Sequence, residues 1–223
     1  MLKAAEYTLL LTLLSMPLAV IAGLGLALMR LSRHRWLKWP AVAYIEVMRG
    51  TPLLVQLFLV YYSLARFGEA MDTHLLTWNN FTVGVFCLAA NYAAYEAEIL
   101  RAGIEAIDKG QREAALSIGM SEWQAFYLIT LPQAFRIVVP PIVNDLIAML
   151  KDSCLVSVIG VQELLNVAVG IGKARFTVPE MILSAAVIYL ILSLACAALG
   201  KYLERALKVK GSHELHLEQA HGH

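Results

Sequence analysis

Residues 7–29 of this 223-residue chain read YTLLLTLLSMPLAVIAGLGLALM and contain no charged side chain. About 20 apolar residues in a helix cross a hydrocarbon layer of roughly 30 Å, so this stretch is long enough to span a membrane. It is longer than the apolar core of a secretory signal peptide, and its basic cluster follows it instead of preceding it. We therefore expect a membrane helix that remains part of the protein.

Four further stretches are candidates for membrane spans. Residues 75–95 and 181–200 are uncharged, residues 50–65 are uncharged but shorter, and residues 137–150 contain one charge, at Asp145. None of them shows the period-two alternation of a membrane barrel strand. The chain is 59% apolar and only 16% charged, whereas soluble domains have about 25% charged residues. The sequence predicts an all-α polytopic membrane protein with five transmembrane helices.

Basic side chains gather in three segments, which indicates the orientation of the chain. They follow the first span (Arg30, Arg33, Arg35, Lys38), lie between the third and fourth (Arg101, Lys109, Arg112, Arg136) and follow the fifth (Lys201, Arg205, Lys208, Lys210). With five spans, all three segments fall on the same side of the membrane. Because Lys and Arg are enriched in cytoplasmic loops, we expect the N-terminus outside and the C-terminus in the cytoplasm.

Composition argues against several classes of function. The net charge of +1 lacks the basic surplus of a nucleic-acid-binding protein, so we expect no nucleic-acid partner. The three cysteines, each inside an apolar stretch, form neither a disulfide framework nor a metal site. No nucleophile with a base and an orienting group can be assigned by spacing. We predict one transmembrane domain over residues 1–211, a polar histidine-containing tail over residues 212–223, and no catalytic residues.

The longest connecting segment, residues 101–136, carries signals for a short helix. Gly110 precedes good helix formers, and we expect a helix over residues 111–118 with Glu113 in its first turn. A negative charge there would complement the free N–H groups of the helix start. Gly119 would end the helix, because glycine adopts a left-handed C-cap conformation at no steric cost.

A second short helix is predicted to follow in the same segment. Ser121 and Gln124 have the spacing of a capping box, and Pro132 would interrupt or kink the helix that they begin. Trp123, Tyr127 and other apolar side chains lie on it. Apolar groups on a compact loop suggest either a docking site for another protein or a hairpin packed on its own bundle. The residues alone leave both possibilities open.

Three elements of this segment have a specific spacing. Glu113-Ala114-Ala115 is followed after three residues by Gly119 and after nine more by Ile129-Thr130-Leu131-Pro132. The pattern resembles the cytoplasmic loop of ABC importer permeases. Residues 49–56, 94–99, 109–111, 131–134 and 159–164 look like segments of bacterial polar amino acid permeases of the histidine, glutamine or arginine type. The resemblance covers residues 4–205, nearly the whole chain.

The resemblance implies the type I permease fold of ABC importers in the bacterial cytoplasmic (inner) membrane. Such a subunit takes a polar or charged L-amino acid from a periplasmic or extracellular binding protein and translocates it by alternating access. It pairs with a second permease subunit, as a homodimer or a heterodimer, and with a dimer of ATP-binding cassette ATPases. The chain itself would hold no cofactor, since ATP and magnesium bind to the ATPase.

By the same resemblance, the short helix before Gly119 is the coupling helix, which sits in a groove of the ATPase. The residues expected at this docking surface are Gln111, Glu113, Ala114, Ala115, Gly119, Leu131 and Pro132. This sequence departs from the family pattern at Asp108, where a proline is commoner, and at Cys154, where a serine is commoner. Neither departure affects the docking pattern.

Polar residues inside or beside the spans are the candidates for contact with a substrate. Polar groups in a membrane are costly and usually face an interior cavity. Acidic side chains could hold the amino group or a basic side chain of an amino acid. The candidates are Asn91, Glu96, Glu98, Asn144, Asp145, Asp152 and Glu163. An alternative for Glu98 is an ion pair with Arg101 at helical spacing.

Two rival functions stay open at this point. The first is a five-span channel or secondary transporter that binds no ATPase. The second is a permease for another small solute, such as an opine or an organic ion. Co-purification with an ATPase distinguishes the first rival, and the ligand of the extracellular binding protein distinguishes the second.

Overall fold

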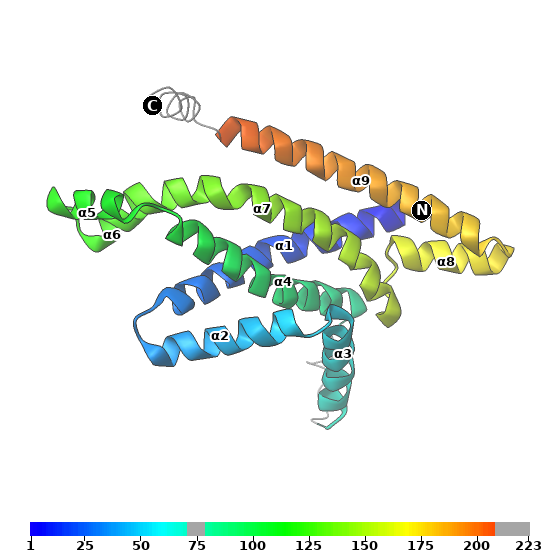
Figure 1. Ribbon diagram of the computed structural model, residues 1–223. Coiled ribbons are helices and arrows are strands. Elements are labelled where there is room, and N and C mark those ends of the chain that lie inside the picture. The colour runs from blue at the N-terminus through cyan, green and yellow to red at the C-terminus, as the bar shows by residue number, and fades with distance from the viewer. Residues whose placement is uncertain (71–78, 208–223) are drawn as a thin grey trace.

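The computed structural model describes residues 1–70 and 79–207, and all regular elements in these two ranges are helices (Figure 1). This confirms the all-α prediction; part of the third predicted span and the histidine-containing tail lie outside the described residues. The elements are α1 (Leu2–Leu31), α2 (Arg35–Gly50), α3 (Leu53–Ala70), α4 (Asn80–Glu105), α5 (Lys109–Ser117), α6 (Glu122–Ala125), a π-helical turn (Phe126–Thr130), α7 (Leu131–Asp152), a 3₁₀ helix (Ser153–Ile159), α8 (Leu164–Arg175) and α9 (Val178–Leu207).

Within the described ranges, α1 and α9 are each long and apolar enough to cross a membrane. Two bent pairs pass the same test when each is taken as one span. The first joins α2 to the start of α3 at 109°, and the second joins the segment from α6 to the 3₁₀ helix with α8 at 52°. The described helices thus supply two to four spans by length and composition. The count of five and the orientation of the termini stay predictions.

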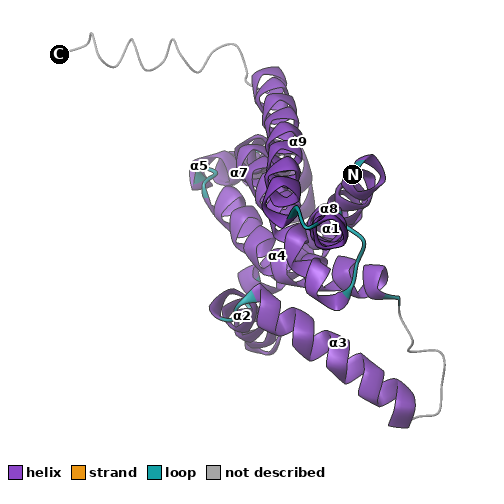
Figure 2. Ribbon diagram, turned by 90° about the vertical axis from the view of Figure 1, so that its right-hand side faces the viewer, coloured by secondary structure: helices purple, strands orange, loops and turns teal. Residues whose placement is uncertain are grey.

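Helices α1 and α4 lie side by side along the middle of the bundle (Figures 1 and 2). Ser15 donates a hydrogen bond to the Val85 carbonyl oxygen at 3.2 Å. Two turns further along α1, a Cβ atom at Gly23 would lie 2.7 Å from the Cβ of Glu96. Both contacts advance in the same direction, so the two helices run parallel.

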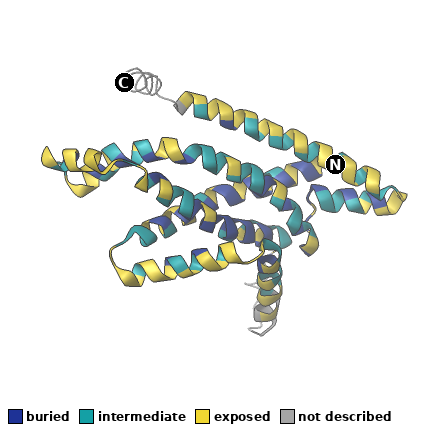
Figure 3. Cartoon of the chain, viewed as in Figure 1, coloured by how far each residue is buried: buried dark blue, intermediate teal, exposed yellow. Residues whose placement is uncertain are grey.

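Small side chains let α1 and α4 approach closely. Ala19 and Ala27 of α1 and Ala93 and Ala97 of α4 are all fully buried, and Gly23 lies among them. Lipid is as apolar as leucine, so membrane helices associate mainly through close packing, which small residues permit. The buried residues therefore concentrate on α1 and α4, while α9 exposes much of its apolar surface (Figure 3).

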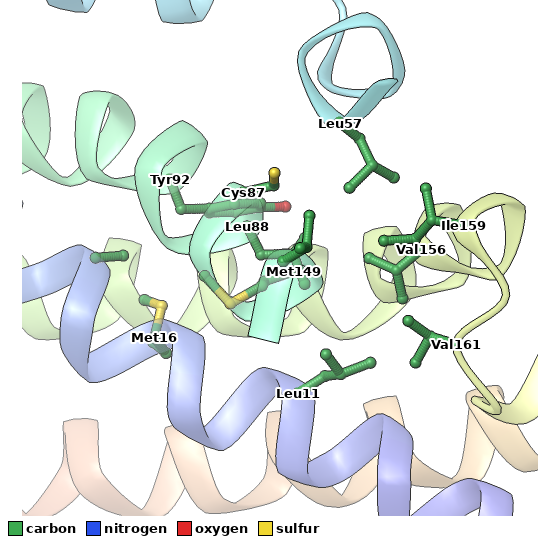
Figure 4. Close-up of a cluster of buried hydrophobic side chains, with 12 residues drawn as sticks. Leu11, Met16, Leu57, Cys87, Leu88, Tyr92, Met149, Val156, Ile159 and Val161 are labelled. Atoms are coloured by element: carbon green, nitrogen blue, oxygen red, sulfur yellow. The ribbon is translucent and has the colours of Figure 1, made fainter. Parts of the chain in front are cut away.

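A cluster of larger side chains joins the other helices to this pair. Leu11 and Met16 of α1 meet Leu88 of α4, Met149 of α7 and Leu57 of α3 (Figure 4). Val156 and Ile159 of the 3₁₀ helix close the same cluster. The α2–α3 turn and the end of α7 are thereby held against one stretch of α4.

The sharp turn between α2 and α3 is stabilised by one amide side chain. Gln56 Nε2 donates to the carbonyl oxygens of Met48 (2.9 Å) and Thr51 (3.1 Å) and to Thr51 Oγ1 (2.8 Å). Pro52 precedes α3 and cannot continue α2, because its nitrogen has no hydrogen to donate. The buried amide therefore replaces the backbone hydrogen bonds that are missing at the turn.

Substitution of Gly23 by alanine tests the close crossing of α1 and α4. The added Cβ would also lie 3.0 Å from the Ala93 oxygen and the Ala97 nitrogen, which are backbone atoms. We expect Gly23→Ala to destabilise the protein by about 1–3 kcal/mol, the usual cost of overpacking, measured as a lower thermal unfolding midpoint in lipid nanodiscs. Gly25→Ala is the matched control, because a Cβ there meets no atom within 4 Å; equal midpoints for the two variants would refute the close crossing.

Candidate functional site

A cavity of about 530 Å³ lies between the α2–α3 turn, α4 and α7. Three of the predicted substrate residues line it: Asn91, Asp145 and Asp152. The other lining residues are Arg49, Gly50, Thr51, Pro52, Leu53, Tyr92, Tyr95 and Ala148. The cavity thus has a basic side chain on α2 and two acidic side chains on α7.

The amide of Asn91 connects α4 to the α2–α3 turn at the edge of this cavity. Its Nδ2 donates to Gln56 Oε1 at 2.9 Å and to the Met48 carbonyl oxygen at 3.3 Å. Gln56 is the residue that holds the turn, so the two amides form a continuous hydrogen-bonded chain. Asn91 therefore positions the cavity wall that carries Arg49.

Aromatic side chains hold the charged groups of the cavity in place. Tyr92 Oη donates a hydrogen bond to Asp152 Oδ2 at 2.8 Å. The Arg49 guanidinium lies over the Tyr95 ring, 5.4 Å from its centroid, in a cation–π contact. Sequence reasoning did not select Arg49, Tyr92 or Tyr95, although Arg49 opens the segment 49–56 on which the family resemblance partly rests.

The other predicted substrate residues do not line this cavity. Glu96 is completely buried behind it, and neither of its carboxyl oxygens has a hydrogen-bond partner among the described residues. Asn144 is exposed on α7. Glu98 forms ion pairs with Arg30 of α1 and with Arg101 Nη2 at 2.9 Å, so the alternative of an ion pair with Arg101 is confirmed.

Glu163 is the N-cap residue of α8, directly before Leu164, and is fully buried. Its carboxylate accepts from the backbone N–H groups of Leu165 (2.9 Å) and Asn166 (2.6 Å) and from Tyr189 Oη (2.6 Å). These three bonds cap α8 and attach it to α9. With 12 residues, α8 is shorter than the about 20 that a helix needs to cross a membrane by itself.

In the connecting segment, residues 101–136, α5 is the predicted short helix, but it begins earlier than expected. It begins at Lys109, and the Asp108 carboxylate caps it by accepting from the Gly110 N–H at 2.7 Å. Glu113 therefore lies in the second turn, and the prediction that it occupies the first turn was wrong. Asp108 supplies the negative charge at the helix start.

The predicted glycine end of this helix is confirmed. Gly119 has φ = +90°, the left-handed conformation that favours glycine. The N–H of Gly119 bonds to the Leu116 carbonyl oxygen at 3.0 Å, and that of Met120 bonds to the Ala115 carbonyl oxygen at 3.1 Å. This pair of bonds is a Schellman motif, which closes α5 and reverses the chain.

The second helix of the segment begins with the predicted capping box. Ser121 Oγ accepts from the Gln124 N–H at 3.3 Å, and Gln124 Oε1 accepts from the Ser121 N–H at 2.8 Å. We expected Pro132 to interrupt or kink this helix, but helical structure continues through it. A π-helical turn precedes it, and Pro132 lies in the first turn of α7, where a missing N–H is tolerated.

An ion pair ties the two helices of the segment together. Arg112 Nη2 lies 2.7 Å and 2.6 Å from the two carboxylate oxygens of Glu122, and Arg112 Nε lies 3.0 Å from Glu122 Oε2. Gln133 Nε2 of α7 donates to Gln111 Oε1 of α5 at 3.2 Å. Movement of α5 is therefore linked to α6 and α7 by side-chain contacts.

Most of the predicted docking residues are available at the surface. Gln111, Glu113, Ala114, Gly119 and Pro132 are exposed, Leu131 is half-buried, and Ala115 is buried. A groove of about 590 Å³ runs along α5, lined by Asp108, Gly110, Gln111, Ala114, Ala115, Ile118, Met120 and Ile129. Ile118 is 77% exposed, and Trp123 stacks on Tyr127 with ring centroids 5.8 Å apart. The surface around α5 thus combines polar and apolar groups.

Known proteins resemble this chain over most of its length. Residues 15–209 match the family described as binding-protein-dependent transport system inner membrane component. The arginine transport system permease protein ArtQ of Bacillus subtilis is 39% identical over 208 residues, which are 93% of this chain and 92% of that protein. The octopine transport system permease protein OccM of Rhizobium radiobacter is 39% identical over 88% of this chain and 81% of its own length.

A solved structure supports the same assignment. A crystal structure of an amino acid ABC transporter with histidines contains a chain that is 41% identical to this one. It superimposes with a TM-score of 0.84 and covers 92% of both chains. The chain belongs to the binding-protein-dependent transport system inner membrane components, and it is the permease subunit of an amino acid ABC importer.

Proposed function

We propose that the cavity between α2, α4 and α7 binds a polar or charged L-amino acid during transport. The observation that carries this proposal is the separation of charge on its walls, with Arg49 on α2 and Asp145 and Asp152 on α7. An amino acid carries a carboxylate and an ammonium group, and each needs an opposite charge when it leaves water. Arg49 would bind the carboxylate, and the two aspartates would bind the ammonium group or a basic side chain.

The proposed pathway includes only some of the residues that the sequence suggested. Asn91, Asp145 and Asp152 line the cavity. The ion pairs of Glu98 and the capping bonds of Glu163 favour structural roles for these two carboxylates. Asn144 stays a pathway candidate only in contact with the second permease subunit, since its side chain is exposed on this chain.

We propose α5 as the coupling helix, held against the ATPase by Gln111, Glu113, Ala114, Ala115, Gly119, Leu131 and Pro132. Helical structure continues without a gap from Glu122 to Asp152, a length of roughly 45 Å at 1.5 Å per residue. Its first residue is paired with Arg112 of α5, and its far end carries Asp145 and Asp152 into the cavity. Closure of the ATPases would move α5, and this continuous helix would carry the motion to the cavity.

The assembly follows from the same proposal. Five spans would place the N-terminus outside, and α5 and the C-terminus in the cytoplasm of a bacterium. The partners are a second permease subunit, a dimer of ATPases that hold ATP and magnesium, and an extracellular or periplasmic binding protein that delivers the substrate. Hydrolysis of ATP would occur on the ATPases, while this chain provides the path through the bilayer.

Transport of an opine is a second candidate, favoured by the similarity to an octopine permease. An opine also carries carboxylate and amino groups, so the same charged walls would suit it. Titration of the cognate binding protein with arginine, histidine, glutamine and octopine distinguishes the two candidates. Binding of octopine, with no measurable binding of arginine, histidine or glutamine, would favour transport of an opine.

The substitution Asp145→Asn tests the role of the cavity. Loss of the negative charge leaves an ammonium group without its partner, and we expect at least a tenfold lower rate of ATP-driven uptake into proteoliposomes. Glu180→Gln is the matched control, because Glu180 is exposed at the start of α9 and outside the cavity. Equal uptake by Asp145→Asn and the control would contradict the proposed binding site.

The substitution Gly119→Leu tests the coupling helix. Leucine disfavours φ = +90° by about 1–2 kcal/mol, so the Schellman motif would open and α5 would lose its position. We expect a several-fold loss of ATPase retained during co-purification, together with a matching loss of uptake. Gly119→Asn should retain most of both, since asparagine tolerates the left-handed conformation; normal retention by Gly119→Leu would refute the proposal.

A further inference from the structure

Two glutamates of this chain are completely buried, yet their surroundings are opposite. Glu163 is 0% exposed and accepts three hydrogen bonds, two of them from backbone N–H groups. Glu96 is also 0% exposed, but neither Oε1 nor Oε2 has a partner in the described part of the chain. The two side chains share one chemistry and one degree of burial, so the difference lies in what surrounds each carboxyl group.

Glu96 lies at the close crossing of α1 and α4. Its Cβ lies against Gly23 of α1. Asp145 of α7 is the acidic group near enough to act on Glu96 electrostatically, and Asp145 Oδ2 is itself buried without a partner. Glu96 does not line the neighbouring cavity, whereas Asp145 does. The carboxyl groups of Glu96 and Asp145 thus interact electrostatically, and only that of Asp145 lines the cavity.

The cations near this pair are engaged elsewhere. On the helices packed against α4, Arg30 of α1 pairs with Glu98, and Arg49 of α2 lies over Tyr95. Other titratable side chains of these helices include Tyr44 of α2, which donates to the Ala90 carbonyl oxygen, and Tyr92 of α4, which donates to Asp152. Further such groups are Cys87 and Tyr95 of α4, Tyr61 of α3, Cys154 of the 3₁₀ helix and the exposed Lys151 of α7. No hydrogen bond or ion pair connects any of these cations to Glu96 in the described residues.

An ionised carboxylate at this position would be very costly. Moving an unpaired charge into a medium of low dielectric constant is so unfavourable that such a group takes up a proton instead. A second carboxyl group close by adds repulsion, and two carboxyls in one site then share a proton. Both effects act in the same direction on Glu96.

We propose that Glu96 and Asp145 form a proton-binding site at the contact of α1, α4 and α7, in which Glu96 is protonated at neutral pH. The site adjoins the transport cavity through Asp145. In the pair the proton is held by Glu96 and the negative charge by Asp145, so a cationic group can enter the cavity beside Asp145 while the pair keeps its one proton. This consequence rests on the proposed substrate cavity, whereas the proton on Glu96 does not.

Infrared spectroscopy of the assembled transporter in lipid nanodiscs tests the site directly. A protonated carboxyl group has a C=O stretching band that an ionised carboxylate lacks. At neutral pH we expect this band in the wild type and its loss in Glu96→Gln. Glu98→Gln is the matched control and should retain the band, since the Glu98 carboxylate is ion-paired with Arg30 and Arg101. A band that persists in Glu96→Gln would overturn the proposal.

Thermal unfolding as a function of pH provides a second readout. An unfolded glutamate is ionised above about pH 4.3, so the folded wild type holds one more proton than the unfolded chain at neutral pH. Raising the pH therefore lowers wild-type stability until Glu96 ionises in the fold. Between about pH 4.3 and the pH at which Glu96 ionises in the fold, we expect the unfolding midpoint of the wild type to fall relative to that of Glu96→Gln as the pH rises.

Two further measurements test whether sodium occupies the site in place of a proton, and provide for a Glu96→Gln variant that does not fold. A midpoint that rises with sodium chloride but not with choline chloride would identify a metal cation at the site and overturn the proposal. If Glu96→Gln does not fold, Asp145→Asn replaces it, because loss of the partner should shift the Glu96 band. An unshifted band in Asp145→Asn would overturn the shared proton. Uptake assays test the proposed substrate cavity and not the proton on Glu96, so the two proposals can fail independently.

Discussion

The close contact of α1 with α4 at Gly23 is the interaction on which the other packing depends. Two later crossings also occur at a glycine: Gly103 of α4 faces Val138 of α7, and Gly200 of α9 faces Val143 of α7. In a bilayer, burial of apolar surface between helices gains little, so backbone proximity has to supply the attraction. A larger side chain at such a crossing would separate the two helices and displace any helix packed against them.

This packing joins the docking surface to the cavity. The segment after α5 is stiffened by the capping box at Ser121 and by the ion pair of Arg112 with Glu122, and it continues into α7. The opposite wall of the cavity is the α2–α3 turn, held by Gln56 and Asn91. One wall is therefore connected to the surface proposed to bind the ATPase, while the other is connected to α4. Relative movement of α7 and the turn would change the shape of the cavity.

Local features of the chain could be predicted well from the sequence. The glycine end of α5 and the capping box at Ser121 depend on residues three to five positions apart, so a short stretch of sequence contains all the information. The start of α5 was misplaced, which moved Glu113 to the wrong turn, because Asp108 was considered as a missing proline and not as a capping residue. The number of spans is harder to predict, since α4 is central and buried yet carries polar residues such as Asn91.

The sequence by itself determined that the chain is helical, that it is apolar enough for a membrane and that a loop with the permease pattern connects two of its helices, because composition and short spacings encode these properties. Only the tertiary structure decided which acidic residues share the cavity. Glu96, Glu98 and Glu163 have similar sequence settings, yet one is unpartnered, one is ion-paired and one caps a helix. Arg49 and Asp145 meet across a single cavity although they are far apart in the chain. Glu98 and Glu163 each take one partner from another helix, Arg30 of α1 and Tyr189 of α9, and only the helix crossings bring those side chains near.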